Sequence, residues 1–356
     1  MIKNKKVTIK DVARVANVSP TTVSFVLNKR PGIPKETRYK VLRVARELNY
    51  TPNLLARSLV KGQTNTISMM ITNTRNPIFP EISYGVDEVL RKHDYTLNII
   101  STYDDLDLEA KEIETLRARG VDGILMSAAL IQSGNIRSLV KSGFPIVSVL
   151  RRVYNCDDLD YVIVDNIKGG YLATEHLIRL GHKRIGIIKG PTKNSTAIER
   201  FQGTTQAFKN YGLAVTDDLI LEGDYFKTSG YIATNAFLNM PKQKCPTSIF
   251  VSNDDMALGA LEAIMDMGLK VPEDIALVGF NDVETASLPS IALTTVSQQS
   301  YKMGGLGAQR LIDKIEKRRG YKKKFQVVLE PELIIRKSCG FSSSKYTLKK
   351  ARKRNI

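Results

Sequence analysis

The sequence predicts a small all-α helix-turn-helix module followed by an α/β body of two doubly wound parallel-sheet lobes. Short helical patterns with a tight turn occupy the first 51 residues, whereas β-rich runs alternate with helical runs from residue 66 to about residue 289. Strands alternating with helices of about 10–15 residues are typical of parallel sheets. A chain of 356 residues is also long enough for two or three domains.

The charge distribution divides the chain in the same way. The chain holds 53 Lys and Arg against 36 Asp and Glu, a net charge of +17. Residues 1–62 have a net charge of +11 and residues 337–356 of +7, whereas the 274 residues between them have a net charge of −1. A basic module on a neutral body indicates a polyanion-binding domain attached to a body with another task.

The leading basic module, residues 1–51, contains two short helical patterns joined by a tight turn. Thr8 can cap the first helix, with Asp11 at the third helical position. Ser19 can cap the second, and Pro20 suits its first position because a missing N–H costs nothing there. Such a pair predicts a helix-turn-helix, whose second helix enters the major groove of DNA. A basic third helix at about 34–48 could be a merely solvated face, but beside this motif we favour DNA binding.

Residues 52–63 predict a hinge helix and linker. Pro52 ends the third helix, Asn53 can cap a new one, and Gly62 ends it after about two turns. A helix this short is marginal alone in water, so we expect it to form only against a partner or DNA.

This basic region resembles the lactose-repressor/galactose-repressor (LacI/GalR) family of bacterial transcription regulators. The resemblance rests on the run from Thr8 to Asn28, on Asn49-Tyr50-x-Pro52-Asn53 and on Ala56-Arg57-Ser58-Leu59, and it extends to about residue 340. It implies a homodimeric repressor that binds double-stranded DNA at a near-palindromic operator, with Leu59 wedged into a base step of the minor groove. The DNA-binding residues that it implies are Thr8, Ser19, Pro20, Thr21, Thr22, Ser24, Phe25, Asn28, Ala56 and Leu59.

Phe25 departs from the family pattern. Many members carry Arg at this position, which can read guanine with two hydrogen bonds. A Phe can touch only apolar edges such as a thymine methyl group, so the operator sequence stays open. Packing of Phe25 against the third helix is an equal alternative.

The resemblance also implies that residues 64–340 form a body like a periplasmic sugar-binding protein. The first lobe would comprise about 64–163 and 294–325, and the second about 164–293 and 326–340, with an effector between them. Ligands of such sheets lie outside the carboxyl ends of the strands. The effector-binding residues that the motifs suggest are Phe79, Arg200, Tyr225, Asn253 and Asn281.

Each of these residues suits a carbohydrate ligand. An aromatic ring can cover the apolar face of a sugar, and the fork of donors of Arg200 can hold a hydroxyl pair or an anion. The asparagines suit hydroxyl groups, although turn chemistry is an alternative for both. Leu150 and Asn281 replace family carboxylates, which disfavours a cationic effector and favours a sugar or sugar phosphate. Control by a protein co-repressor, as in the family's catabolite-control branch, is the alternative.

Other function classes fit the sequence poorly. No G-x-G-x-x-G follows a strand, no G-x-x-x-x-G-K-[ST] is present, and the only histidines are His93, His176 and His182. We therefore expect no enzyme, catalytic residue, cofactor or metal, although an α/β enzyme is a remote alternative. Three cysteines without a C-x-x-C pair, no signal-peptide pattern and no apolar run of about 18 residues predict a cytoplasmic protein without a membrane partner. The family resemblance implies that it is nucleoid-associated when bound to its operator.

The end of the chain is the second basic segment. Residues 341–356 are too polar and too basic to predict packing, so we expect a disordered tail, with auxiliary DNA contact as the alternative. No leucine heptad follows the body, which favours a dimer over a tetramer.

Overall fold

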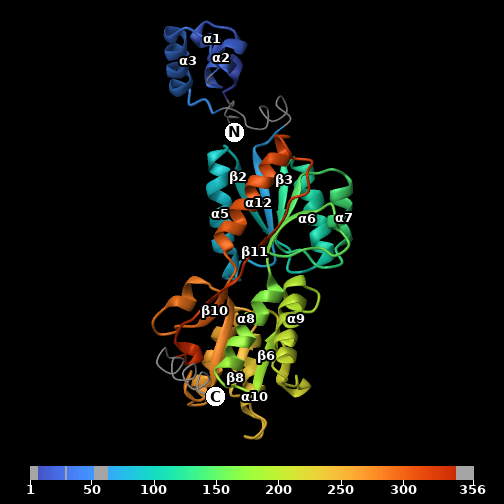
Figure 1. Ribbon diagram of the computed structural model, residues 1–356. Coiled ribbons are helices and arrows are strands. Elements are labelled where there is room, and N and C mark those ends of the chain that lie inside the picture. Colours follow the sequence, from blue (N-terminus) through green and yellow to red (C-terminus); the bar gives the residue numbers. More distant parts are fainter. Residues whose placement is uncertain (1–6, 29, 52–62, 342–356) are drawn as a thin grey trace, which may run out of the picture. The chain divides into compact units, whose positions relative to one another are not determined.

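The computed structural model of the chain describes residues 7–28, 30–51 and 63–341 (Figure 1). The chain forms two compact units that divide between Thr64 and Asn65. Within the described ranges, no helix is both long enough and apolar enough to cross a membrane.

The first unit is a bundle of three helices, α1 (Ile9–Ala16), α2 (Pro20–Leu27) and α3 (Lys35–Glu47). The predicted caps are confirmed: the carboxylate of Asp11 accepts hydrogen bonds from the amide and the hydroxyl of Thr8, and the hydroxyl of Ser19 accepts from the amide of Thr22 at 3.0 Å. The three helices enclose a small core of fully buried aliphatic residues, which includes Val12, Ala16, Val23, Val26, Val41 and Val44.

The first lobe of the second unit contains a six-stranded parallel sheet in the order β11-β5-β4-β3-β1-β2. Its strands are β1 (Thr66–Ile71), β2 (Thr96–Ser101), β3 (Gly123–Met126), β4 (Ile146–Val149), β5 (Asp160–Val164) and β11 (Gln326–Leu329). The helices of this lobe are α5 (Ile78–Lys92), α6 (Leu106–Ala118), α7 (Gly134–Lys141) and α12 (Ser300–Ile315). Strands β3 and β4 are buried throughout, as expected for a sheet covered on both faces.

The second lobe repeats this architecture in the order β12-β10-β9-β8-β6-β7. Its strands are β6 (Ile185–Lys189), β7 (Ile220–Glu222), β8 (Ser248–Val251), β9 (Ala276–Asn281), β10 (Thr294–Ser297) and the antiparallel edge strand β12 (Glu332–Ile334). Its helices are α8 (Asn166–Arg179), α9 (Ser195–Asn210), α10 (Lys227–Leu238) and α11 (Asp254–Asp266), with 3-10 turns at Asp217–Leu219, Glu284–Ser287 and Lys337–Cys339.

The strand pairing differs from the expected lobe boundaries at two segments. Residues 294–325 were expected in the first lobe, but β10 pairs with β9 in the second sheet. Residues 326–340 were expected in the second lobe, but β11 pairs with β5 in the first. The chain therefore crosses between the lobes after β5, between β10 and α12, and between β11 and β12. These crossings are fixed by pairing between distant segments, which local sequence patterns do not reveal.

The body also extends one residue into the segment that was predicted to be a disordered tail. The ring of Phe341 lies 6.0 Å from that of His176 on α8, and Phe341 packs against the core of the body. Burial of a large aromatic side chain is energetically favourable. The prediction of a disordered tail was therefore wrong at Phe341. Residues 342–356 lie outside the described part of the chain.

Two glycines let α8 and α9 approach each other closely. A Cβ atom on Gly170 of α8 would overlap the main-chain carbonyl of Arg200, and one on Gly203 of α9 would overlap the carbonyl of Ile167. This close contact fixes the height and rotation of α9 against α8, and with them the place of the Arg200 side chain.

Gly170→Ala should therefore destabilise the body. Overpacking of this kind costs about 1–3 kcal/mol, so we expect thermal unfolding to shift down by several degrees. The matched control is Gly134→Ala at the start of α7, where a Cβ atom would meet no atom within 4 Å. Equal melting temperatures for the two variants would show that α8 and α9 are not held at this distance.

Candidate functional site

The predicted DNA-reading residues cluster on and around α2. Thr8, Ser19, Pro20 and Thr21 are exposed, while Thr22, Ser24, Phe25 and Asn28 are half-buried. Some of these polar side chains are engaged within the module: the side-chain amide of Asn28 donates to the carbonyl of Ser24 at 2.8 Å. Ala56 and Leu59, the other two predicted residues, lie outside the described residues.

Phe25 is covered by an arginine from the same module. The guanidinium of Arg30 lies 5.0 Å from the centre of the Phe25 ring, a cation–π arrangement. Arg38 of α3 donates to the carbonyl of Arg30 at 2.7 Å and so ties this residue to the third helix. Arg30 therefore places a guanidinium beside α2. Position 25 itself, where the family resemblance implies an arginine in many members, is a phenylalanine.

In the second unit, the five predicted effector-binding residues line a single cavity between the two lobes. Its volume is about 20 Å³, roughly the room that one water molecule requires. It lies beyond the carboxyl ends of the strands, as expected for this class of sheet. The lining residues are Asn76, Ile78, Phe79, Leu150, Arg151, Thr196, Arg200, Tyr225, Asn253 and Asn281.

Arg200 of α9 is at the centre of this site and only 2% exposed. Its Nε donates to the side-chain oxygen of Asn166 at 2.9 Å, and its Nη1 donates to the carbonyl of Ser252 at 2.5 Å. Weaker contacts reach the side-chain oxygens of Asn281 at 3.5 Å and Gln298 at 3.4 Å. The guanidinium also stacks 3.6 Å from the centre of the Phe280 ring. Protein groups thus accept from Nε, Nη1 and Nη2, with two contacts short and two long.

Burial changes the protonation equilibrium of this arginine without neutralising it. Desolvation lowers the pKa of Arg200 to about 10, against smaller raising effects from Tyr225 and Asp254. The guanidinium is therefore still positively charged near neutral pH. In the described part of the chain no carboxylate pairs directly with Arg200, and such a buried cation is a strong attractor for anionic or hydroxyl oxygens.

The other predicted residues differ in what their polar atoms contact. The hydroxyl of Tyr225 hydrogen-bonds to that of Thr196 at 3.0 Å, and the side-chain oxygen of Asn281 accepts from the amide of Gln298 at 2.9 Å. Asn253 caps α11 through the amide of Met256 and donates to the carbonyl of Tyr225 at 2.9 Å. Asn253 thus performs the turn chemistry that was the alternative to hydroxyl recognition.

Three further polar side chains line the cavity that were not predicted as effector-binding, Asn76, Arg151 and Thr196. Arg151 is 4% exposed, and its Nη1 lies 2.6 Å from the carboxylate of Asp104. It directly follows Leu150, whose backbone φ of 76° lies in the left-handed region. Neither Arg151 nor Thr196 belongs to a local motif, and only the facing of the two lobes brings them to the cavity.

A relay of polar contacts links the first lobe to Arg200. Arg152, which follows β4, pairs with the carboxylate of Glu199 on α9 at 2.8 Å. The other oxygen of that carboxylate accepts from the side-chain amide of Asn166 at 3.2 Å, and Asn166 in turn accepts from Arg200. Since Arg152 and Arg200 belong to different lobes, a change in lobe orientation must disturb the contacts of the effector-site arginine.

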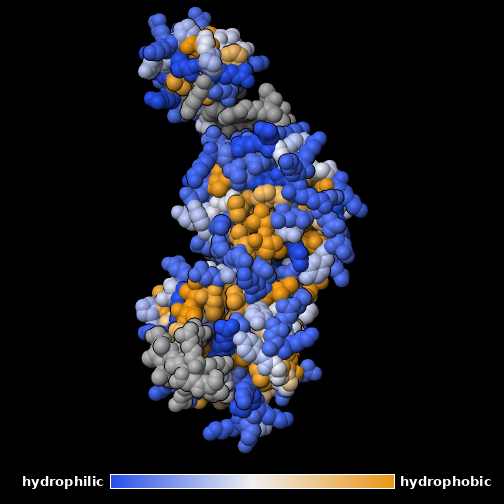
Figure 2. Space-filling view, viewed as in Figure 1, coloured by the Kyte–Doolittle hydropathy of each residue, from blue (hydrophilic) through white to orange (hydrophobic). Residues whose placement is uncertain are grey.

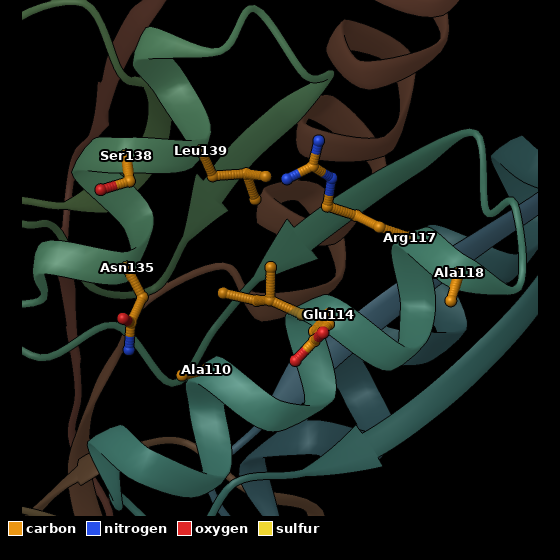
Figure 3. A pocket seen from close by; sticks show the side chains of 8 residues that line it. Ala110, Glu114, Arg117, Ala118, Asn135, Ser138 and Leu139 are labelled. Carbon is orange, nitrogen blue, oxygen red and sulfur yellow. The ribbon is translucent and has the colours of Figure 1, made fainter.

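A larger cavity, of about 510 Å³, lies on the first lobe between α6 and α7 (Figure 3). In this view the side chain of Arg117 extends from α6 toward Leu139 of α7. This larger cavity contains none of the predicted effector-binding residues, and it is not at the carboxyl ends of the strands. Size alone therefore does not identify the site, and the cleft around Arg200 is the better candidate.

The fold and the cleft agree with comparisons to known proteins. The family model described as "Bacterial regulatory proteins, lacI family" matches residues 8–53, and the one described as "Periplasmic binding proteins and sugar binding domain of LacI family" matches residues 64–332. A relative, the HTH-type transcriptional repressor PurR of Histophilus somni, is 37% identical over 334 residues, which cover 93% of this chain and 98% of that protein.

Two solved structures show the same likeness. The lac repressor dimer bound to operator and the anti-inducer ONPF is 28% identical, with a TM-score of 0.84, and the match covers 94% of this chain and 99% of that chain. The transcriptional regulator CelR in complex with cellobiose is 29% identical, with a TM-score of 0.71 over 93% of this chain and 99% of that chain. The chain therefore belongs to the LacI family of bacterial regulatory proteins, as an effector-controlled DNA-binding transcriptional repressor and not an enzyme.

Proposed function

We propose that this repressor acts as a homodimer on a near-palindromic operator and that its effector is a sugar or sugar phosphate bound around Arg200. The observation that carries the effector proposal is the lining of the cleft. It combines two aromatic rings, two buried arginines and, among the described residues, no carboxylate. Such a lining favours a neutral or anionic ligand with an apolar face and several hydroxyl groups.

The structure of the transcriptional regulator CelR in complex with cellobiose supports a carbohydrate ligand for this type of cleft. In the proposal, Phe79 and Tyr225 cover the sugar ring, while Arg200 binds a hydroxyl pair or a phosphate. Asn281 is the polar neighbour of Arg200 at the end of β9 and serves as a further hydroxyl partner.

Effector binding requires the cleft to rearrange. A cavity of about 20 Å³ cannot hold a sugar ring, so the lobes must separate or the internal contacts of Arg200 must be exchanged for contacts to the ligand. Hinge motion about the three crossovers is the established way for such lobes to open and close. A ligand that binds one orientation better shifts the population toward it, and only this difference in affinity can control DNA binding.

On the DNA side, we propose that the exposed start of α2 reads bases and that its flanks contact the backbone. Pro20, Thr21 and Phe25 are the base-reading positions, and Thr22, Ser24 and Asn28 lie nearer the phosphates. Two such modules related by two-fold symmetry require two half-sites in opposite orientation.

A second candidate function is a repressor governed mainly by a protein co-repressor. It is favoured by one observation: the donors of Arg200 and the side chains of Asn253 and Tyr225 are already engaged by other protein groups. Because protein groups already bind the polar side chains of the cleft, the closed cleft is stable without a small molecule, and control by a protein partner becomes the alternative.

Footprinting of the gene's upstream region, with and without a panel of sugars, sugar phosphates and nucleobases, separates these proposals. The carbohydrate proposal expects a protected palindrome whose protection a sugar or sugar phosphate alters. Protection that no small molecule alters would favour the protein co-repressor, and protection altered only by a nucleobase would refute the carbohydrate assignment.

Arg200→Gln should remove the response to the effector. Hydrogen bonds to a charged group contribute about 1.5–3 kcal/mol, so we expect effector affinity, measured by calorimetry, to fall about 10- to 100-fold. The matched control is Arg179→Gln, which removes a surface arginine from the neighbouring helix α8. An effector affinity unchanged by Arg200→Gln would remove this residue from the binding site.

Arg152→Gln tests the relay without touching the cavity, because Arg152 is not among its lining residues. Loss of the cross-lobe ion pair should destabilise the observed orientation, whose cavity is too small for a sugar ring, and so strengthen effector binding several-fold. A double-mutant cycle with Glu199→Gln should show strong coupling, since the two side chains form one pair. Additive effects of the two substitutions would contradict the relay.

Leu59→Ala tests the proposed minor-groove wedge. We expect operator affinity to fall while weak binding to unrelated DNA is retained, because phosphate contacts supply most of the non-specific affinity. Gel-shift titrations on operator and scrambled duplexes measure both quantities. An equal loss on the two duplexes would refute the wedge.

A further inference from the structure

The near-neutral body contains one strongly basic surface segment. Residues 316–324, Glu-Lys-Arg-Arg-Gly-Tyr-Lys-Lys-Lys, hold six basic residues and one acidic residue. The rest of residues 63–336 holds 26 basic and 32 acidic residues, so this short segment carries an excess positive charge that the surrounding body lacks. We call residues 316–324 the basic loop.

The basic loop is held in a defined conformation by buried charges beneath it. Arg310 of α12 is 6% exposed, and its Nε donates to the carboxylate of Asp160 at 2.8 Å. Its Nη2 donates to the main-chain carbonyls of Tyr321 and Lys323. Asp160 also accepts from the amide of Phe325 at 2.9 Å. The loop backbone is thus fixed from below, and its lysine side chains remain at the surface.

Several cations of the loop have no carboxylate partner among the described residues. Lys317, Arg319, Lys322 and Lys323 are all exposed, and no ion pair joins them to an acid in that part of the chain. The helix dipole favours basic residues in the last turn of a helix, but α12 ends at Ile315, so the dipole does not account for residues 319–324.

The loop lies at the edge of the body where the DNA-binding module is attached. It precedes β11, and the described chain enters the body just before β1; the two strands run parallel in the same sheet. Their starts lie at one end of the first lobe (Figure 1), where hydrophilic residues gather on the surface (Figure 2). Four strand spacings separate them, roughly 19 Å.

Chain length limits how far this edge can be from bound DNA. Fourteen residues lie between Thr51, the last described residue of the module, and Thr66, and the fifteen steps from one to the other span at most about 50 Å. When the module binds an operator half-site, the basic loop is therefore held at a high effective concentration near the adjoining duplex. This holds for any orientation of the two units.

From this placement we propose that the basic loop binds backbone phosphates of the DNA flanking the half-site that its own module reads. The contacts are independent of sequence and add affinity without specificity. DNA is preferred over an acidic protein as the occupant because the covalent attachment brings DNA to this edge whenever the repressor is bound.

The test compares salt dependence on two duplexes. One ends at the operator, and the other extends it by about 15 base pairs on each side, which covers the reach of the tether at 3.4 Å per pair. For the full-length Arg319→Gln/Lys322→Gln/Lys323→Gln variant, we expect a shallower plot of log affinity against log salt on the extended duplex. The slope should fall in magnitude by about 1 for each phosphate that the variant no longer neutralises. On the short duplex the variant should equal the wild type.

The control variant Lys209→Gln/Lys242→Gln/Lys244→Gln removes three exposed positive charges from the second lobe. It should behave as the wild type on both duplexes, and Lys322→Arg/Lys323→Arg should retain the full slope. Equal slopes for the triple variant and the control on the extended duplex would overturn the proposal. Unchanged DNA binding with weakened repression in cells would also overturn it and would favour an acidic protein as the occupant. Binding of the wild type to the short duplex shows separately that the operator-reading module works.

Discussion

The organisation of the second lobe depends on the burial of one positive charge, that of Arg200. A guanidinium taken out of water costs several kcal/mol unless protein groups replace the water that it loses. Arg200 is served by Asn166 at the start of α8, the carbonyl of Ser252 after β8, Asn281 at the end of β9 and Gln298 after β10. The carboxyl edge of the second sheet must be assembled for this charge to be tolerated, so the stability of the lobe and the construction of its ligand site are the same problem.

The same charge explains why the cleft can act as a switch. A ligand oxygen that reaches Arg200 competes with protein acceptors already in place, and one of these acceptors, Asn166, also binds the carboxylate of Glu199. Glu199 pairs in turn with Arg152 of the other lobe. In a low-dielectric interior such contacts strengthen one another, so ligand contacts and lobe orientation are energetically connected. The proposed DNA contact of the basic loop is at the amino ends of the strands of the first lobe, opposite the cleft. A change in lobe orientation would therefore affect this contact as well as the hinge segment.

Features set by neighbouring residues could be predicted from the sequence, and features set by distant pairing could not. The caps at Thr8 and Ser19 follow from residues three positions apart, and the alternating pattern predicts two parallel sheets. The exchange of β10 and β11 between lobes depends on pairing with strands far away in sequence. Asn253 was predicted for its position after β8; it lines the cavity, and its side chain also caps α11. Arg151 enters the cavity without any motif, because the facing lobe creates its environment.

We propose that the Arg200 cleft and the DNA-binding module are coupled through two orientations of the lobes. The most direct measurement is the affinity of the full-length repressor for its effector, by calorimetry, with and without saturating operator duplex. Thermodynamic linkage requires the effector affinity to change by the same factor by which the effector changes operator affinity. We predict such a reciprocal change, typically about 5- to 150-fold. Equal effector affinity for the free and the operator-bound repressor would show that the cleft and the DNA-binding module are not coupled.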